Sequence, residues 1–271
     1  MIKIILHGCM GRMGKMIAQL VQDEQGMQVV AGVDAMAQSN QESSYPVFES
    51  MSACDVPADV VIDFSNVSAT DDLLQACADQ KLPLVLCTTG LSEEQLRRVN
   101  ELSQLIPVLR SANMSLGINT LLKVLADAAP VLCAAGFDVE VVEKHHRHKL
   151  DAPSGTALAL ADAVNEAVTD KRSADGVDSA NQEQAFSYVY DRSGRRAERA
   201  ADEIGISAVR GGSIVGEHDV IFAGTDEVVT FSHTAYSRAI FAKGAITAAA
   251  FLAGRQPGMY SMADVVQSAA D

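Results

Sequence analysis

The sequence predicts an α/β protein with a doubly wound, Rossmann-like parallel sheet and a second, α+β domain. Short, almost continuously apolar runs alternate with amphipathic helical patterns in the first part of the chain; they lie at residues 2–6, 29–33, 60–64, 84–87 and 106–109. Strands that are apolar on both faces are typical of a parallel sheet covered by helices on both sides. After about residue 115, strand-like runs are instead grouped together.

Helical periodicity supports the first domain. The apolar positions after the first strand recur at i, i+3 and i+4 spacing, at Met13, Met16, Ile17, Leu20 and Val21. Farther along, Ser92 and Gln95 have the spacing of a capping box, which predicts that a helix begins there.

The second part predicts helices at 115–129 and 156–168, on either side of a strand at 137–143. The polar stretch 169–184 predicts a mobile surface loop. Three strand-like runs follow, around 185–190, 204–210 and 217–234, and Gly224, Thr225 and Asp226 predict a hairpin turn within the last run. We therefore expect a largely antiparallel sheet, and a final helix at 238–254 that returns to the first domain. We also expect two domains, 1–115 plus 239–271 and 116–238.

Composition narrows the function. The chain has 271 residues, a formal net charge of -14 and no tryptophan, which disfavours binding to nucleic acid or to an anionic membrane. The N-terminal apolar run is too short for a signal peptide, and we expect no membrane-spanning stretch. Five cysteines without CxxC spacing indicate reduced thiols in a cytoplasmic protein.

A glycine-rich loop predicts dinucleotide binding. Gly8, Gly11 and Gly14 are spaced GxxGxxG between a strand and a helix, and Asp34 follows the second strand. The first glycine permits a tight turn, the second a close approach to pyrophosphate, and the third close helix packing. Asp34 would accept hydrogen bonds from the adenosine ribose. The alternative is a glycine-rich turn without a ligand.

Two further loops follow the fourth and fifth strands, at residues 87–90 and 112–115. Ligands of open parallel sheets lie beyond the carboxyl ends of the strands, so these loops would face the nicotinamide half of the cofactor. Pattern alone leaves ordinary turns as an alternative for each.

The run from Lys144 to Lys149 places three histidines, an arginine and two lysines before the sequence Pro153-Ser154-Gly155-Thr156, which opens a helix. A solvated loop and a histidine metal site are two explanations, although neighbouring histidines on extended chain point to opposite faces. The third explanation is an anion receptor at a helix N-terminus, beside groups that can donate a proton. We favour the third and predict no metal.

The stretch EKHHRHKLDAPSGTA at 143–157 resembles the motif of the 4-hydroxy-tetrahydrodipicolinate (dihydrodipicolinate) reductase family. The likeness extends to HGCMGRMG at 7–14, TTG at 88–90, ANMSLGIN at 112–119, VRGGSIVGEHDVIF at 209–222 and SRAIFAKGA at 237–245. The resemblance implies a homotetramer that reduces a cyclic imine dicarboxylate with NADH or NADPH in lysine and diaminopimelate biosynthesis. It also implies that residues 1–115 plus 239–271 bind the dinucleotide, and that residues 116–238 form the substrate-binding and tetramerisation domain.

The resemblance also implies residue roles. His145 would be an acid/base residue and Lys149 the proton donor. His146, Ser154, Gly155 and Thr156 would bind substrate, and Arg238 would reach it when the domains close. The implied cofactor-binding residues are Gly8, Cys9, Met10, Gly11, Arg12, Met13, Asp34, Cys87, Thr88, Thr89, Ala112, Asn113, Met114 and Ser115.

Two positions depart from the family pattern. Cys87 stands where relatives commonly have glycine, and Ala35 follows Asp34 where many relatives have an arginine that would meet an NADP phosphate. We therefore expect NADH to be preferred, with NADPH also used. The rival functions are a non-catalytic NAD(H)-binding redox sensor, and a semialdehyde dehydrogenase-like enzyme with Cys133 as nucleophile.

Overall fold

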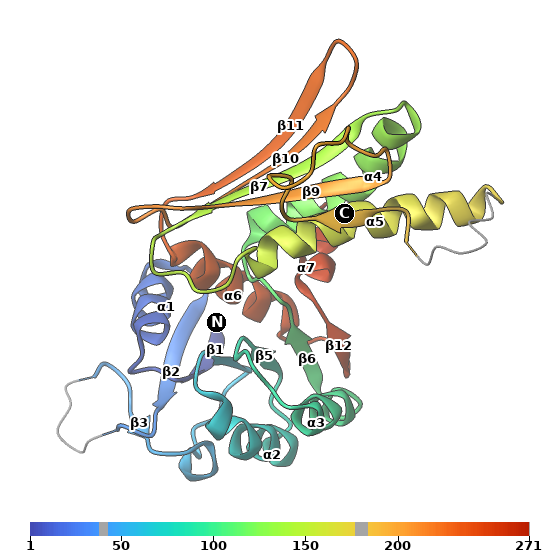
Figure 1. Ribbon diagram of the computed structural model, residues 1–271. Helices are drawn as coiled ribbons and strands as arrows, with labels where there is room; N and C mark the ends of the chain where they lie inside the picture. The colour runs from blue at the N-terminus through green and yellow to red at the C-terminus, as the bar shows by residue number, and fades with distance from the viewer. Residues whose placement is uncertain (38–42, 177–183, 271) are drawn as a thin grey trace. The chain divides into compact units, whose positions relative to one another are not determined.

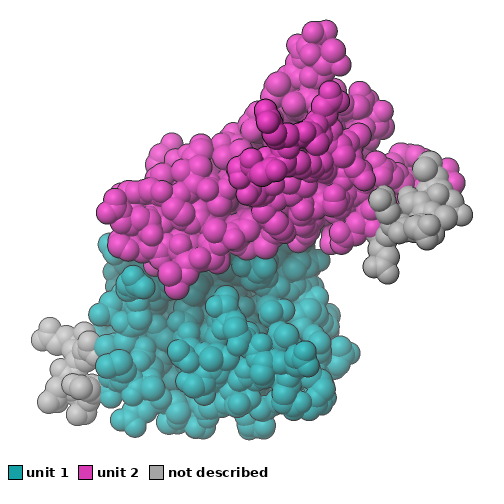
Figure 2. Space-filling model, in the orientation of Figure 1, with its two compact units in different colours: residues 1–116, 239–271 teal, residues 117–238 magenta. Residues whose placement is uncertain are grey.

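The computed structural model describes residues 1–37, 43–176 and 184–270 (Figure 1). The chain divides into two compact units, which Figure 2 colours separately. Unit 1 comprises Met1–Leu116 and Ala239–Asp271, and unit 2 comprises Gly117–Arg238.

In the described residues, unit 1 contains a seven-stranded sheet of order β12-β6-β5-β4-β1-β2-β3. All neighbouring strands in it run parallel. The strands are β1 (Ile2–His7), β2 (Met27–Val33), β3 (Val47–Phe48), β4 (Val60–Asp63), β5 (Leu84–Leu86), β6 (Pro107–Arg110) and β12 (Gly258–Tyr260). The five strands expected from the sequence are present. The short edge strands β3 and β12 were not predicted, because runs of two or three residues carry no periodicity.

Helices cover both faces of this sheet. One face packs on α1 (Arg12–Asp23), α6 (Ala239–Leu252) and α7 (Met262–Ala270), and the other on α2 (Thr70–Gln80) and α3 (Glu93–Ser103). Along β1, Ile4 and Leu6 are buried under the first group and Ile5 under the second. Two 3₁₀ turns, Met51–Ala53 and Val67–Ala69, precede α2. The prediction of a doubly wound sheet is confirmed, as is the Ser92–Gln95 capping box at the start of α3.

The strand order defines where a ligand can bind. From β1 the chain proceeds outward to β2 and β3, and then crosses back to β4 on the other side of β1. The crossover point lies between β1 and β4, where the loops beyond the two carboxyl ends diverge. Ligands of doubly wound sheets bind in this crevice.

Unit 2 combines α4 (Leu116–Ala134) and α5 (Gly155–Ala174) with a five-stranded sheet of order β11-β10-β7-β9-β8. Its strands are β7 (Asp138–His145), β8 (Ser187–Val189), β9 (Glu203–Arg210), β10 (Gly216–Ala223) and β11 (Val228–Ala235). The expected hairpin joins β10 to β11, where Gly224 N donates to Glu227 O.

The sheet is mixed rather than largely antiparallel, which corrects the prediction. β10 is antiparallel to β7 and β11, but β7, β9 and β8 are parallel to one another. The cause is α5, which links β7 to β8 and β9 as a helical crossover, and such a crossover connects parallel strands. The expected loop at 169–184 is also partly wrong, because α5 continues to Ala174; residues 177–183 lie outside the described part.

Among the described helices, α4 is long and apolar enough to cross a membrane, with a mean hydropathy of 1.5, contrary to the expectation. It nevertheless carries Lys123 and Asp127, and it buries Leu125 and Ala129 in the core of unit 2. Core helices of globular proteins often have this composition, so the helix alone is weak evidence for a membrane span.

Candidate active site

The glycine loop joins β1 to α1 and has the geometry that a dinucleotide requires. Gly8 has a positive φ of 79°, and a Cβ there would lie 2.5 Å from the Phe64 carbonyl oxygen. A Cβ on Gly14 would lie 2.3 Å from the Gly8 carbonyl oxygen. Both positions therefore require glycine, the first for conformation and close approach and the second for packing α1 on the loop.

Gly11 is the exposed N-cap of α1. The helix has no side-chain cap and no acidic residue in its first turn. Its N-terminal dipole and backbone N–H groups therefore suit an anion such as pyrophosphate.

Asp34 lies beside this loop. Its Oδ2 accepts a hydrogen bond from Met10 N at 2.9 Å, and its Oδ1 accepts one from Met36 N at 3.0 Å. These bonds hold the carboxylate between the first two βα loops, where an adenosine ribose would bind.

The other predicted cofactor residues divide by exposure. Arg12, Thr89 and Ala112 are exposed, whereas Met10, Met13, Cys87 and Asn113 are half-buried. Cys9, Thr88, Met114 and Ser115 are buried, and the side chains of Cys9 and Met114 belong to the hydrophobic core. For those two residues only the backbone is suited to face a ligand.

The cysteines are free thiols. Burial raises the pKa of Cys9 to about 11, with a contribution from Asp34. Burial likewise raises the pKa of Cys87 well above its usual value, assisted by the charge of Asp63. The Cys133 thiol, which is half-buried, has its pKa raised to about 11 by burial. These thiols are poor nucleophiles because the thiolate is the reactive form.

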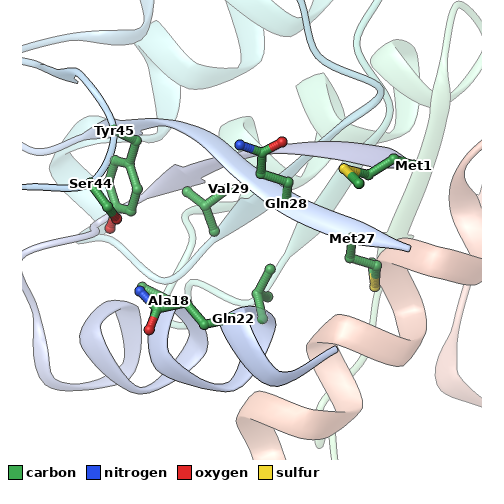
Figure 3. A pocket seen from close by; sticks show the side chains of 9 residues that line it. Met1, Ala18, Gln22, Met27, Gln28, Val29, Ser44 and Tyr45 are labelled. Atoms are coloured by element: carbon green, nitrogen blue, oxygen red, sulfur yellow. The ribbon is translucent and has the colours of Figure 1, made fainter. Parts of the chain in front are cut away.

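A cavity of about 340 Å³ lies between α1 and β2 in unit 1 (Figure 3). Residues of both elements line it, including Ala18, Gln22 and Gln28. None of the described side chains that line it is charged. The described part of the lining therefore offers no cation to bind pyrophosphate.

In unit 2, the end of β7 carries the predicted acid/base residue. His145 is buried, and its Nδ1 lies 2.6 Å from Oε2 of the fully buried Glu143. The pair differs by two residues along the strand, so both side chains project from the same face of the sheet.

Arg210, at the end of β9, completes this cluster. Its guanidinium donates to both carboxylate oxygens of Glu143, at 2.7 and 2.6 Å. Ser154 N also donates to Glu143, at 3.0 Å. Burial alone would raise the pKa of Glu143, but the hydrogen bonds from Arg210, His145 and Ser154 outweigh burial and lower it. Glu143 is thus an anion, and His145 donates its Nδ1 proton to it.

Ser154 and His218 extend the cluster. Ser154 is the N-cap of α5; its Oγ accepts from Ala157 N and lies 2.9 Å from Nε2 of His218. Burial and the neighbouring His145 lower the pKa of His218 to about 4, so this ring is neutral at pH 7. Because Ser154 is buried and its hydroxyl is engaged, it organises the helix terminus. The direct substrate contact that the resemblance implied for Ser154 stays a prediction.

The cationic run begins in the last two residues of β7 and continues, at 146–149, as a turn in which Lys149 N donates to His146 O. Lys149 Nζ pairs with Asp151 at 2.9 Å, while Arg147 and His148 are exposed. His146 is half-buried with a buried Nδ1 that lacks a partner among the described residues.

The remaining predicted substrate residues lie at two places. Gly155 and Thr156 form the first turn of α5, directly after the Ser154 cap. Arg238 is exposed beyond the end of β11, at the end of unit 2. Among the described residues, no group of three or more His, Cys, Asp or Glu side chains could hold a metal ion.

Sequence reasoning missed Glu143, Arg210 and His218 as site residues. For Glu143 the sequence carried a signal, because strand alternation places it on the same face as Val139 and Val141, which would put an acid in the core two residues before His145. A buried acid requires partners. Arg210 and His218 come from distant strands, and the pairing of strands is not readable from the sequence.

Two family profiles cover most of the chain. The profile described as "Dihydrodipicolinate reductase, N-terminus" matches residues 2–114, and "Dihydrodipicolinate reductase, C-terminus" matches residues 117–266.

Individual relatives agree with the profiles. The chain is 50% identical to the 4-hydroxy-tetrahydrodipicolinate reductase of Caldanaerobacter subterraneus subsp. tengcongensis, over 98% of this chain and 99% of the relative. It is 47% identical to the enzyme of the same name from Clostridium novyi, over 99% of each. A solved structure, dipicolinate-bound dihydrodipicolinate reductase from Paenisporosarcina sp. TG-14, shares the fold with a TM-score of 0.75 at 24% identity, covering 96% of this chain and 97% of that one. This chain belongs to the dihydrodipicolinate reductase family.

Proposed function

We propose that this protein reduces 4-hydroxy-tetrahydrodipicolinate to tetrahydrodipicolinate with NADH or NADPH, in lysine and diaminopimelate biosynthesis. The observation that carries the proposal is the buried Glu143–His145 pair, 2.6 Å apart, at the strand end that leads into the cationic turn and the α5 N-terminus. This arrangement combines an oriented imidazole with a receptor for an anion.

The glycine loop and Asp34 fit a dinucleotide. The Gly8 and Gly14 positions exclude a Cβ, the N-terminus of α1 is uncapped, and the Asp34 carboxylate is fixed between the first two loops. When bound, a reduced nicotinamide supplies the hydride. The chain's own contribution is to hold the pyrophosphate at the helix terminus and the ribose at Asp34.

A dicarboxylate substrate suits the first turn of α5. The helix N-terminus carries partial positive charge, and Gly155 has open space at its Cβ position, which permits close approach to the backbone. Thr156 adds a hydroxyl group. We assign Gly155, Thr156 and His146 to substrate binding, with Arg238 as a further contact.

The 4-hydroxyl group of the substrate leaves as water, and hydride addition to the ring then creates negative charge that a proton must neutralise. Lys149 carries transferable protons at Nζ, and we assign it as the donor. His145 donates its Nδ1 proton to Glu143, which fixes the ring and leaves Nε2 for acid/base work.

The decisive experiment adds freshly generated substrate to the enzyme and NADH and follows oxidation of the cofactor. Turnover supports the reductase, whereas NADH binding without oxidation supports the redox sensor. The semialdehyde dehydrogenase alternative requires a reactive cysteine, and the raised pKa of Cys133 opposes it.

The anion receptor has its own test. Pyridine-2,6-dicarboxylate, a flat dicarboxylate, should inhibit competitively with substrate and less strongly in Thr156→Val. Thr247→Val serves as the matched control, because its hydroxyl bonds within α6 of unit 1, to Lys243 O. Inhibition that competes only with dinucleotide would show that the receptor is misassigned.

We further propose that the enzyme is a cytoplasmic homotetramer assembled through the sheet of unit 2. Val209 on β9 and Val228 on β11 are 45% and 62% exposed, and exposed apolar side chains on this sheet suit a contact between copies. Light scattering of the purified protein would measure the oligomeric state, and a monomer would overturn the assignment.

A further inference from the structure

His7 and Asp63 form a buried polar pair at the crossover point of the parallel sheet. His7 is the last residue of β1 and Asp63 the last of β4, and the two are register partners on adjacent strands. His7 Nδ1 lies 2.8 Å from Asp63 Oδ1, and the residues are 4% and 0% exposed. Apart from the exposed Lys3, the other residues of both strands are apolar, so the buried polar side chains of these strands lie at their carboxyl ends.

The pair connects three loops. Gly8 directly follows His7, and a Cβ on Gly8 would lie within 2.9 Å of Ser65 Cα. Ser65 N donates to Asp63 Oδ1 at 3.1 Å, and Ser65 Oγ lies 3.5 Å from Thr88 Oγ1 in the loop after β5. Asp63 O also accepts from Cys87 N. The loops after β1, β4 and β5 are therefore fixed relative to one another through Asp63.

The pKa of Asp63 shows that its interaction with His7 stabilises the ionised carboxylate. Burial opposes ionisation of Asp63, yet the hydrogen bond and charge of His7, with contributions from Ser65 and Thr88, lower the pKa of Asp63 below its usual value. Asp63 is therefore a buried anion, and His7 must donate to it. Loss of the donor would leave the charge without its main partner, and the loops would rearrange to replace it.

We infer that the His7–Asp63 pair positions the loops that bind the dinucleotide, so that it sets the affinity for NADH and not the affinity for substrate. This inference rests on the proposed function for the identity of the ligand. His7 acts through Asp63, Ser65 and Thr88, and is a positioning residue rather than a catalytic one.

Two amide replacements of His7 provide the test. The amide nitrogen of asparagine occupies the place of Nδ1, whereas that of glutamine extends toward the place of Nε2. His7→Asn should bind NADH within about threefold of wild type, because it retains the donor to Asp63. His7→Gln and His7→Ala should raise the Kd for NADH by about tenfold. We expect a smaller effect than the roughly hundredfold loss of rate that a 1 Å misplacement of reacting groups can cause, because only the supporting loops shift.

Calorimetric titration with NADH gives the Kd, and inhibition by pyridine-2,6-dicarboxylate reports the substrate site, which should change little. Val99→Ala is the matched control, since it removes buried volume from α3 away from these loops. It should lower Tm and leave the Kd unchanged. Equal NADH affinity in His7→Asn and His7→Gln, or a Kd that only follows Tm across all variants, would overturn the inference. A wild type that binds no NADH would overturn the proposed function as well.

Discussion

His145 and Glu143 are joined by a hydrogen bond of 2.6 Å between Nδ1 and Oε2, inside a core where Glu143 has no exposed surface. The bond fixes the ring tautomer and leaves Nε2 as the second, functional nitrogen. The same carboxylate binds Arg210 through both oxygens, so the imidazole, the guanidinium and the start of α5 are held by one anion.

Glu143→Gln should impair catalysis while preserving shape. The amide can donate toward Nδ1 and so favours the wrong tautomer of His145, which we expect to lower kcat by about 10²-fold. The unfolding free energy should also fall by about 3 kcal/mol or more, because Arg210 loses its carboxylate partner. Steady-state kinetics and urea unfolding measure the two effects. Glu217→Gln, whose carboxylate pairs with Lys144 at the surface, is the control; an equal loss of kcat there would contradict the role of Glu143.

Gly216→Ala tests the free nitrogen of His145. Gly216 is the first residue of β10 and precedes Glu217, whose register partner on β7 is Lys144. A Cβ at Gly216 would lie 3.1 Å from Nε2 of His145. The added methyl group must displace the ring or block its nitrogen. We expect kcat to fall by about tenfold or more. Gly211→Ala, where a Cβ meets no atom within 4 Å, should leave kcat near wild type. Unchanged kcat in Gly216→Ala would show that Nε2 has no role in the reaction.

Lys149→Ala should lower kcat strongly and KM less, because proton donation counts mainly in the transition state. A general acid typically contributes about 10²–10⁴-fold. Asp151→Asn removes the ion pair and keeps the Lys149 amine. Asp151 is exposed, and its bond to Lys149 lowers the pKa of the carboxyl group. Such surface pairs contribute little stability, so the variant should fold normally. This control should retain kcat. A value for Lys149→Ala within about threefold of wild type would remove the assignment.

Much of unit 1 could be predicted because its strands are uniformly apolar and its helices amphipathic, so that periodicity alone identifies them. The glycine loop was equally readable, since Gly8 and Gly14 serve local backbone geometry. Long-range relationships were not readable. The pairing of β7 with β9 brings Arg210 to Glu143, and the pairing of β1 with β4 brings His7 to Asp63. Ser154 shows the same limit, because its burial depends on His218 from β10.

His218 should make stability depend on pH. Its pKa is lowered from 6.5 to about 4 in the folded protein, so between these values the unfolded chain binds more protons. Stability therefore falls as pH decreases from about 6.5 toward 4. The contribution of this group between pH 7 and pH 5 should be about 2 kcal/mol.

Urea unfolding of wild type and His218→Gln at pH 7 and pH 5 measures the contribution of His218 to the pH dependence of stability. Glutamine is a suitable replacement because its amide can retain the bond to Ser154. The loss of stability on going to pH 5 should be smaller in the variant by that amount. Identical pH dependence in the two proteins would mean that His218 is not held neutral.

Cofactor choice should favour NADH. Asp34 is fixed by Met10 N and Met36 N beside the glycine loop, and the next residue, Ala35, offers no cation. The 2′-phosphate of NADPH would lie close to this carboxylate. The repulsion between the two negative charges is on the order of 4 kcal/mol at close range before salt screening. Because the phosphate can turn toward solvent, about 1–2 kcal/mol should remain, which is roughly a tenfold preference in kcat/KM.

The measurement is kcat/KM for both cofactors at one ionic strength, in wild type and in Ala35→Arg. The variant should gain NADPH activity, because a guanidinium binds phosphate and offsets the Asp34 charge. Arg12 is the residue that could reverse the wild-type preference, since it is exposed at the first position of α1 in the same loop. If wild type used NADPH as well as NADH, and Arg12→Ala then lost only the NADPH activity, the phosphate would be bound by Arg12 and the role given to Ala35 would be wrong.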